Sequence, residues 1–181
     1  MELGDRTVVV TGGASGIGRA MAERFARERP SGIVIADIDG AGAQAVAEGV
    51  GCIAVAADLS TEAGVLQVIE AAESAYGQVD AYCSNAGVGL PYGGAEVPDE
   101  DWMRHWNLHV MSHVWGVRAL IPGMVERGDG YLLNIASMAG LLMTMGAVPY
   151  TATKHAAIAL AESLSVLHAG TGVRFSCLCP I

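Results

Sequence analysis

The feature that most constrains the fold is a regular alternation along the chain. Short, apolar, β-branched runs alternate with longer, Ala-rich segments at helical spacing. Runs that are almost continuously apolar are typical of parallel strands covered on both faces. The predicted strands are Thr7–Thr11, Ile33–Asp37, Cys52–Ala56, Val79–Ser84, Tyr131–Ala136 and Val173–Cys179, and the predicted helices are Ile17–Glu28, Gly42–Glu48, Gly64–Tyr76, Glu100–Glu126 and Tyr150–His168. This pattern predicts an α/β fold with a doubly wound parallel sheet and right-handed crossovers, whose ligands bind outside the carboxyl ends of the strands.

The composition favours one soluble domain over residues 1–181. Hydrophobic residues make up 52% of the 181 residues and charged residues 16%, which excludes intrinsic disorder. The net charge of −9 argues against a surface that binds nucleic acid electrostatically, although backbone N–H groups can still hold a single nucleotide. The first six residues contain no apolar core of a signal peptide, and polar residues interrupt the uncharged stretch between Asp129 and Lys154. We therefore expect a cytoplasmic protein without a membrane span.

A glycine-rich turn joins the first predicted strand to the first predicted helix. Its sequence is Thr11-Gly12-Gly13-Ala14-Ser15-Gly16-Ile17-Gly18. Glycines permit positive φ and a close approach of a pyrophosphate to the backbone, and the N–H groups of the helix start then face the phosphates. The G-x-x-x-G-x-G spacing differs from the common G-x-G-x-x-G and from a P-loop. A glycine-rich turn without a ligand remains the alternative.

Asp37 ends the second predicted strand, about 20 residues after the glycine turn. A carboxylate at this position accepts hydrogen bonds from an adenosine ribose and repels a 2′-phosphate. Ser15 precedes Gly16, and neither of the two residues after Asp37 is basic. These features favour NAD over NADP. The alternative for Asp37 is a cap or turn former at a strand end.

Polar residues also follow two later strands. Ser84-Asn85-Ala86-Gly87 follows the fourth, Ser137 closes the fifth, and Tyr150-x-x-x-Lys154 opens the next helix. Residues four apart share one helix face, and an ammonium there favours the phenolate form of a tyrosine. Such a tyrosine can exchange a proton with an alcohol, while a serine hydroxyl holds the substrate oxygen.

In this order and spacing, TGGASGIG, SNAG, a strand-end serine and YTATK resemble the short-chain dehydrogenase/reductase family over essentially the whole chain. The resemblance implies a Rossmann-type fold of three α/β/α layers and hydride transfer between a nicotinamide and a secondary alcohol or ketone. It implies that Tyr150 is the general acid/base, that Lys154 holds the nicotinamide ribose, that Ser137 orients the substrate carbonyl and that Asn107 keeps a water in the proton relay. The implied cofactor-binding residues are Gly12, Ser15, Gly16, Ile17, Gly18, Asp37, Ile38, Asp58, Leu59, Asn85, Ala86, Gly87, Tyr150, Lys154, Pro180 and Ile181.

The chain departs from the family pattern in two places. Ser84 replaces the asparagine more often found before Asn-Ala-Gly. Family members also continue past the position of Pro180 with a substrate-covering segment, a helix and a final strand. We therefore expect the chain to lack its C-terminal strand and to have an open substrate pocket.

Two clusters allow more than one interpretation. Histidines recur every four residues, interleaved with tryptophans: His105, His109, His113, Trp102, Trp106 and Trp115. No acidic ligand set accompanies them, so no metal site is predicted. In the resembling family this helix packs against its copy, which favours an interface stripe and a homodimer or homotetramer through the helices around Asp101–Arg118 and Tyr150–His168. The residues Met138, Leu141, Leu142, Met143 and Met145 are predicted to be either core or an apolar substrate wall.

The sequence therefore predicts an NAD-dependent alcohol or ketone oxidoreductase that acts on an apolar small molecule. The alternative from another class is a catalytically silent dinucleotide-binding module that acts as a sensor or partner protein. A sugar-nucleotide epimerase is a third possibility, although that branch carries a different glycine spacing.

Overall fold

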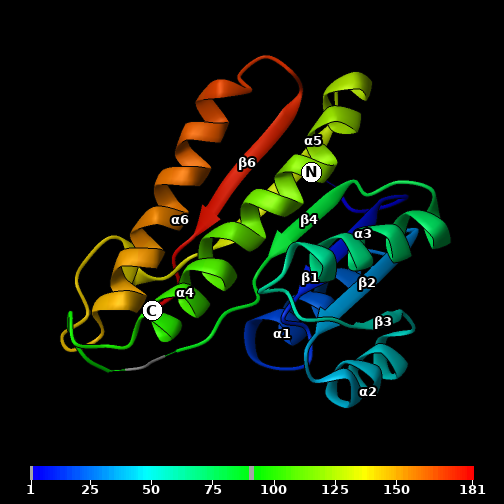
Figure 1. Ribbon diagram of the computed structural model, residues 1–181. Helices are drawn as coiled ribbons and strands as arrows, with labels where there is room; N and C mark the ends of the chain where they lie inside the picture. Colours follow the sequence, from blue (N-terminus) through cyan, green and yellow to red (C-terminus); the bar gives the residue numbers. More distant parts are fainter. Residues whose placement is uncertain (1, 90–91) are drawn as a thin grey trace.

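The computed structural model describes residues 2–89 and 92–181 and confirms the doubly wound α/β fold. Six parallel strands form one sheet in the order β3-β2-β1-β4-β5-β6 (Figure 1). The strands are β1 Thr7–Thr11, β2 Gly32–Asp37, β3 Ile53–Ala56, β4 Ala81–Ser84, β5 Gly130–Ile135 and β6 Val173–Leu178. The helices are α1 Gly16–Ala26, α2 Gly40–Val50, α3 Glu62–Tyr76, α4 Asp99–Trp106, α5 Ser112–Arg127 and α6 Val148–Leu167.

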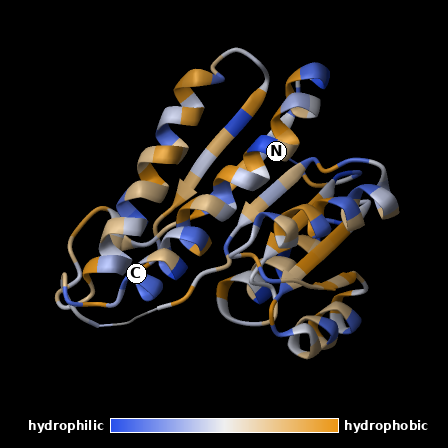
Figure 2. Ribbon diagram, viewed as in Figure 1, coloured by the Kyte–Doolittle hydropathy of each residue, from blue (hydrophilic) through white to orange (hydrophobic). Residues whose placement is uncertain are grey.

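Successive residues of each inner strand contribute to opposite sides of the sheet. Val9 packs in a core cluster with residues of α3 and α5, whereas its neighbours Val8 and Val10 pack in a second cluster with residues of α1 and α2. All five residues of β1 are buried, which explains its unbroken apolar character. Figure 2 shows this pattern: the inner strands are mainly hydrophobic, while the helices mix hydrophobic and hydrophilic residues.

The strand order reverses between β1 and β4, which are neighbours although α1, β2, α2, β3 and α3 separate them in the sequence. From this point the chain winds outward to β3 on one side and to β6 on the other (Figure 1). A crevice forms outside the carboxyl ends of two strands at such a reversal. Thr11 ends β1 and Ser84 ends β4, so the glycine turn and the Asn-Ala-Gly segment lie together there.

The predicted helix Glu100–Glu126 is wrong as a single α-helix. A π-helical turn, Asn107–Met111, separates α4 from α5. The Ser112 N–H donates to the Asn107 carbonyl, five residues back, which leaves the Leu108 carbonyl without its usual partner. The Ser112 hydroxyl donates to that carbonyl at 2.6 Å and so satisfies it. The wider turn is stable because this side chain replaces the missing backbone bond.

The other predicted elements are confirmed with shifts of a few residues at their ends, and a short 3-10 turn, Met138–Gly140, was not predicted. Ser137 begins this turn, because its hydroxyl accepts a hydrogen bond from the Ala139 N–H at 3.1 Å. Over the described residues, no helix combines the length and apolar character that crossing a membrane requires.

Candidate active site

The glycine turn after β1 adopts a conformation that only small residues allow. Gly12 and Gly16 have φ values of +66° and +53°. A Cβ on Gly18 would lie 2.0 Å from the Gly12 carbonyl oxygen, so the turn folds directly onto the start of α1. The N–H groups of Gly12 and Gly13 both donate to the Ala36 carbonyl, at 2.7 and 3.2 Å, which fixes the turn to β2. The predicted backbone cradle at the start of a helix is therefore present.

Thr11 and Asn85 hold the two strand-end segments together. The Thr11 hydroxyl accepts the N–H groups of Asn85 and Ala86, at 2.8 and 3.0 Å, and donates to the Cys83 carbonyl at 3.1 Å. The Asn85 amide donates to the carbonyls of Thr11 and Gly12, at 2.8 and 3.2 Å. Sequence reasoning did not assign Thr11 a role, although a hydroxyl residue at a strand end, directly before two glycines, is the signal that could have identified it.

One pocket, of about 330 Å³, lies beside the carboxyl ends of β1, β2 and β3. Most of the residues predicted to bind the adenosine end line it, and α4 and the π turn contribute two more. Its lining residues are Gly12, Asp37, Ile38, Ala57, Asp58, Leu59, Ser60, Ala86, Gly87, Val88, Arg104 and Leu108. Asp37 also serves as the predicted turn former, because its carboxylate accepts the N–H groups of Ala14 and Asp39, both at 3.0 Å. The two interpretations of Asp37 are therefore compatible.

A second pocket, of about 300 Å³, adjoins the first and shares Gly87 and Val88 with it. It brings together three of the four predicted catalytic residues and most of those predicted for the nicotinamide end. Its lining residues are Ile17, Asn85, Gly87, Val88, Gly89, Ile135, Ala136, Ser137, Tyr150, Lys154, Pro180 and Ile181. Three elements, β5, α6 and the segment after β6, thus converge with the loop after β4 on one cavity.

Lys154 approaches this cavity from a buried position in α6. Its Nζ donates to the Ile135 carbonyl at 3.1 Å and lies 5.6 Å from the centre of the Tyr150 ring. Burial lowers the pKa of Lys154 to about 8, and the nearby Cys177 and Cys179 oppose this shift. A lysine with this pKa is still mostly an ammonium at neutral pH. Ser137 faces the same pocket, and because its oxygen only accepts the Ala139 N–H, its hydrogen is available for donation.

Asn107, the fourth predicted catalytic residue, stays a prediction. Asn107 is half-buried at the first position of the π turn and does not line the pocket of Tyr150. The residue of this turn that reaches Tyr150 is His109, whose ring meets the Tyr150 ring edge-on with 5.5 Å between centres. Sequence reasoning missed His109 as a site residue.

The histidine stripe lies inside the protomer. His105, His109 and His113 are all at most 1% exposed, so the prediction that they form an interface stripe is wrong. Their i, i+4 spacing does place them on one face, but that face packs against α6 and the sheet: His109 contacts Thr153 and His113 lies beside Asn134. Burial, followed by the charge of Lys154, lowers the pKa of His109 to about 2 and that of His113 to about 3. Both are therefore neutral in the folded protein.

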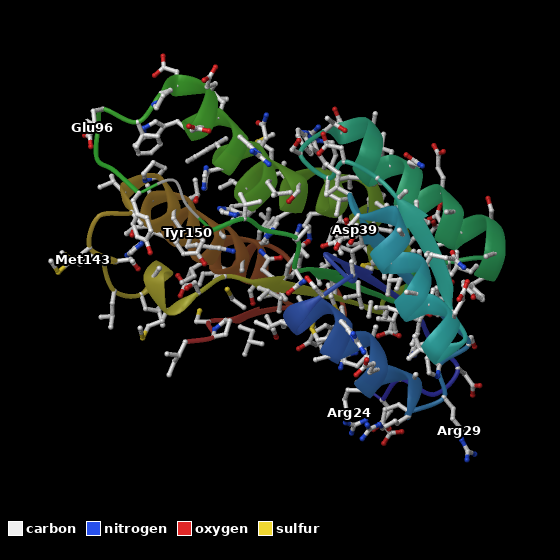
Figure 3. The ribbon with its side chains drawn as sticks, turned by 90° about the horizontal axis from the view of Figure 1, so that it is seen from below. Arg24, Arg29, Asp39, Glu96, Met143 and Tyr150 are labelled. Carbon is white, nitrogen blue, oxygen red and sulfur yellow. The ribbon has the colours of Figure 1, made fainter. Side chains whose placement is uncertain are left out.

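The methionine-rich loop between Ser137 and Tyr150 is not core. Met143 and Met145 are 75% and 82% exposed, and Leu141 and Leu142 are also largely exposed. Figure 3 shows Met143 at the outer edge of the molecule, with Tyr150 lying further in. This loop, residues 138–148, is called the apolar rim below. The prediction of buried packing is wrong because the loop projects beyond the sheet, where nothing in the described chain covers it.

Comparison with known proteins identifies the group to which this chain belongs. A family model described as "short chain dehydrogenase" matches residues 6–181. The chain belongs to the short-chain dehydrogenase family. It is 41% identical over 188 aligned residues to a 1-deoxy-11-beta-hydroxypentalenate dehydrogenase of Streptomyces exfoliatus, covering 99% of this chain and 68% of the relative. It is 34% identical to a 3beta-hydroxysteroid dehydrogenase 2 of Eggerthella lenta, covering 98% of this chain and 71% of the relative.

Solved structures of the same family agree closely with the fold. A 3-ketoacyl-(acyl-carrier-protein) reductase from Brucella melitensis, complexed with NADH, superposes with a TM-score of 0.93 at 35% identity and covers 98% of this chain and 76% of that one. A short-chain dehydrogenase/reductase from Burkholderia phymatum, in complex with NAD, gives a TM-score of 0.94 at 34% identity. The match covers 99% of this chain and 66% of that one. Membership of the short-chain dehydrogenases makes this chain part of an oxidoreductase family.

Proposed function

We propose that this short-chain dehydrogenase transfers a hydride between NAD and a secondary alcohol or ketone, with Tyr150 as the proton-transfer group. The observation that carries the proposal is the convergence of Ser137, Tyr150 and Lys154 on a cavity that adjoins the glycine turn. A tyrosine, an ammonium and a free hydroxyl hydrogen are together sufficient to move a proton to or from an alcohol oxygen.

The residues present fit a dinucleotide. The turn through Gly12, Gly16 and Gly18 leads into the N-terminus of α1, where no side chain caps the helix at Ser15, so its backbone N–H groups and the helix dipole favour a pyrophosphate. The two adjoining pockets, which meet at Gly87 and Val88, would take the adenosine and nicotinamide ends. When bound, the nicotinamide accepts or supplies the hydride.

Each residue of the site has a distinct task in this proposal. Lys154, held by the Ile135 carbonyl, places a positive charge near the Tyr150 ring. Tyr150 then removes the alcohol proton during oxidation or returns it during reduction. Ser137 donates its hydroxyl hydrogen to the substrate oxygen, because its own oxygen already accepts the Ala139 N–H.

We propose NAD as the cofactor rather than NADP. The Asp37 carboxylate lines the adenosine pocket, where it can accept the ribose hydroxyls and would repel a 2′-phosphate. The solved relatives described as bound to NADH and NAD support this preference.

We propose an apolar substrate, because the exposed apolar rim connects Ser137 to the start of α6, which carries Tyr150. Residues Met143, Met145 and Val148 of the rim line a separate cavity of about 260 Å³ together with Thr151 of α6. Methionine side chains adapt their shape to bulky apolar ligands. The relatives named for 1-deoxy-11-beta-hydroxypentalenate and for 3beta-hydroxysteroids support a polycyclic alcohol as the first class to test.

The deciding experiment is the Tyr150→Phe variant of the complete protein, assayed with NAD and a panel of apolar secondary alcohols by NADH absorbance. We expect NADH affinity to be retained and turnover to fall by about a hundredfold or more, since only the proton-transfer group is removed. The matched control is Tyr76→Phe, at the end of α3 and distant from both site pockets.

Two outcomes would contradict the proposal. Turnover of Tyr150→Phe close to that of the unmodified protein would remove Tyr150 from the mechanism. Tight NADH binding by the unmodified protein without oxidation of any alcohol or reduction of any ketone would favour the silent dinucleotide-binding module.

Assembly of two or four copies through α4, α5 and α6 is also part of the proposal. Apolar side chains are exposed on these helices: Met103 and Trp106 on α4, and Val166 and Leu167 on α6. Sedimentation of Trp106→Glu should give a smaller species than the unmodified protein, and an unchanged mass would contradict this arrangement.

A further inference from the structure

A chain of hydrogen bonds runs from the loop after β4 to the first turn of α6. The Val88 N–H donates to His109 Nε2 at 3.0 Å, so Nε2 carries no proton. His109 is neutral, because its pKa lies near 2, and its proton is therefore on Nδ1. Nδ1 lies 3.0 Å from the Thr153 hydroxyl and donates to it. The single hydrogen of the Thr153 hydroxyl is shared between the carbonyls of Pro149 and Tyr150, at 2.9 and 3.0 Å.

The two ends of this hydrogen-bond chain, at Val88 and at Tyr150, belong to different parts of the site. Val88 lines both pockets and lies where they meet. Tyr150 carries the proposed proton-transfer hydroxyl, and its own backbone carbonyl is one of the final acceptors. The loop also packs directly against His109, since a Cβ on Gly87 would lie 3.3 Å from His109 Nε2 and 3.6 Å from Lys154 Nζ.

Packing fixes the His109 ring in one orientation. The ring is fully buried, with the His105 ring edge-on at 5.3 Å and the Tyr150 ring edge-on at 5.5 Å. Lys154 provides a positive charge nearby, which opposes a second cation on the histidine. A neutral ring with one fixed proton and two occupied nitrogens has no free group to exchange a proton with a substrate.

We propose that His109 is a positioning residue: through Val88 on one side and Thr153 on the other, it sets the distance between the bound nicotinamide and Tyr150. This inference rests on the proposed function. Hydride and proton transfer require the reacting groups to be held within a fraction of an ångström, and a misplacement of about 1 Å can reduce the rate roughly a hundredfold. Loss of the hydrogen-bond chain should therefore affect turnover more than cofactor affinity.

Three variants of the complete protein test the Val88 end and the Thr153 end of the hydrogen-bond chain separately. His109→Phe removes both nitrogens but keeps an aromatic ring, and His109→Gln can still present an oxygen near the Nε2 position to the Val88 N–H. Thr153→Val removes the hydroxyl and keeps the branched shape, which matters because Thr153 is fully buried. The matched control is His155→Phe, which makes the same substitution at an exposed position of α6.

We expect Thr153→Val and His109→Gln to retain the NADH dissociation constant within about twofold while kcat falls by roughly tenfold or more. His109→Phe should lower kcat to a similar extent and also weaken NADH binding. The double variant His109→Phe/Thr153→Val should be no slower than His109→Phe alone, because both changes break the same chain. His155→Phe should match the unmodified protein.

Unchanged kcat in Thr153→Val and His109→Gln would overturn the inference, as would multiplicative losses in the double variant. If His109→Phe does not fold, the kcat values of Thr153→Val and His109→Gln still test the inference. Failure of this inference is distinguishable from failure of the proposed function. In the first case the unmodified protein is active, Tyr150→Phe is inactive and the Thr153 and His109 variants are fully active. In the second case the unmodified protein itself oxidises no alcohol and reduces no ketone.

Discussion

Two buried histidines should make the folded protein sensitive to mild acid. The pKa of His109 is lowered to about 2 and that of His113 to about 3, chiefly by burial and next by the charge of Lys154. A histidine in the unfolded chain has a pKa of about 6.5. Below that pH the unfolded state binds two protons that the folded state excludes. The contribution of these histidines to stability is therefore fully present above about pH 6.5 and is lost as the pH falls.

The size of this loss follows from the shifts. Each histidine removes about 1.4 kcal/mol of unfolding free energy per pH unit below its unfolded pKa, so at about pH 5 each has removed roughly 2 kcal/mol. The two together remove roughly 4 kcal/mol, a large part of the 5–15 kcal/mol that is typical of a folded domain. The 19 Asp and Glu residues interfere little in this range, because carboxylates take up protons mainly below about pH 5.

Urea unfolding followed by tryptophan fluorescence, repeated between about pH 7 and about pH 5, measures the effect. The slope of unfolding free energy against pH should correspond to the uptake of nearly two protons on unfolding. The variant His113→Gln should reduce this number to about one. The control His155→Gln changes an exposed histidine and should leave the slope unchanged. The argument that these rings stay neutral in the folded state would be refuted if the unmodified protein took up fewer than one proton on unfolding. It would also be refuted if His113→Gln gave the same slope as the unmodified protein.

Two further predictions concern the cofactor cradle. Asp37→Ser should weaken NADH binding and improve NADPH binding, because it removes the carboxylate that would repel a 2′-phosphate; fluorescence titration with both cofactors measures this, and an unchanged preference would remove Asp37 from the adenosine site. Gly18→Ala should destabilise the protein by about 1–3 kcal/mol, because the added Cβ would meet the Gly12 carbonyl at 2.0 Å. The matched control Gly49→Ala, in α2 with nothing within 4 Å, should instead gain up to about 1 kcal/mol, and equal effects at the two positions in urea unfolding would contradict the steric argument.

The sheet and the glycine turn were predictable because their signals are local. An unbroken apolar run such as β1 has few alternatives to a strand buried on both faces, and glycines spaced before a helix specify a tight turn. The preference for right-handed crossovers and the βαβ alternation then predict a doubly wound parallel sheet, but they do not fix the strand order, which the structure supplies. That Ser137 and Tyr150 lie near one another could be predicted for the same reason, since they stand just after a strand and in the first turn of a helix, and Lys154 follows Tyr150 by about one turn.

The π turn and the burial of the histidines were not predictable in this way. A π turn inserts one extra residue and changes which side chains share a face, yet its stabilising bond, from the Ser112 hydroxyl to the Leu108 carbonyl, has no distinctive sequence pattern. Helical spacing did place His105, His109 and His113 on one face. It could not tell whether α6 or another subunit covers that face, because this depends on contacts between residues far apart in the sequence.

The polar residues around the crevice act mainly on the backbone. Thr11 and Asn85 satisfy N–H and carbonyl groups at the ends of β1 and β4, and His109 and Thr153 do the same between Val88 and the first turn of α6. Backbone groups exposed at strand ends must find partners, and the side chains that supply them also fix the relative positions of the segments. The loop after β4 is therefore held from the β1 side and from the α6 side at once. A change at either side is expected to move the wall that the two pockets share and, in our proposal, the nicotinamide relative to Tyr150.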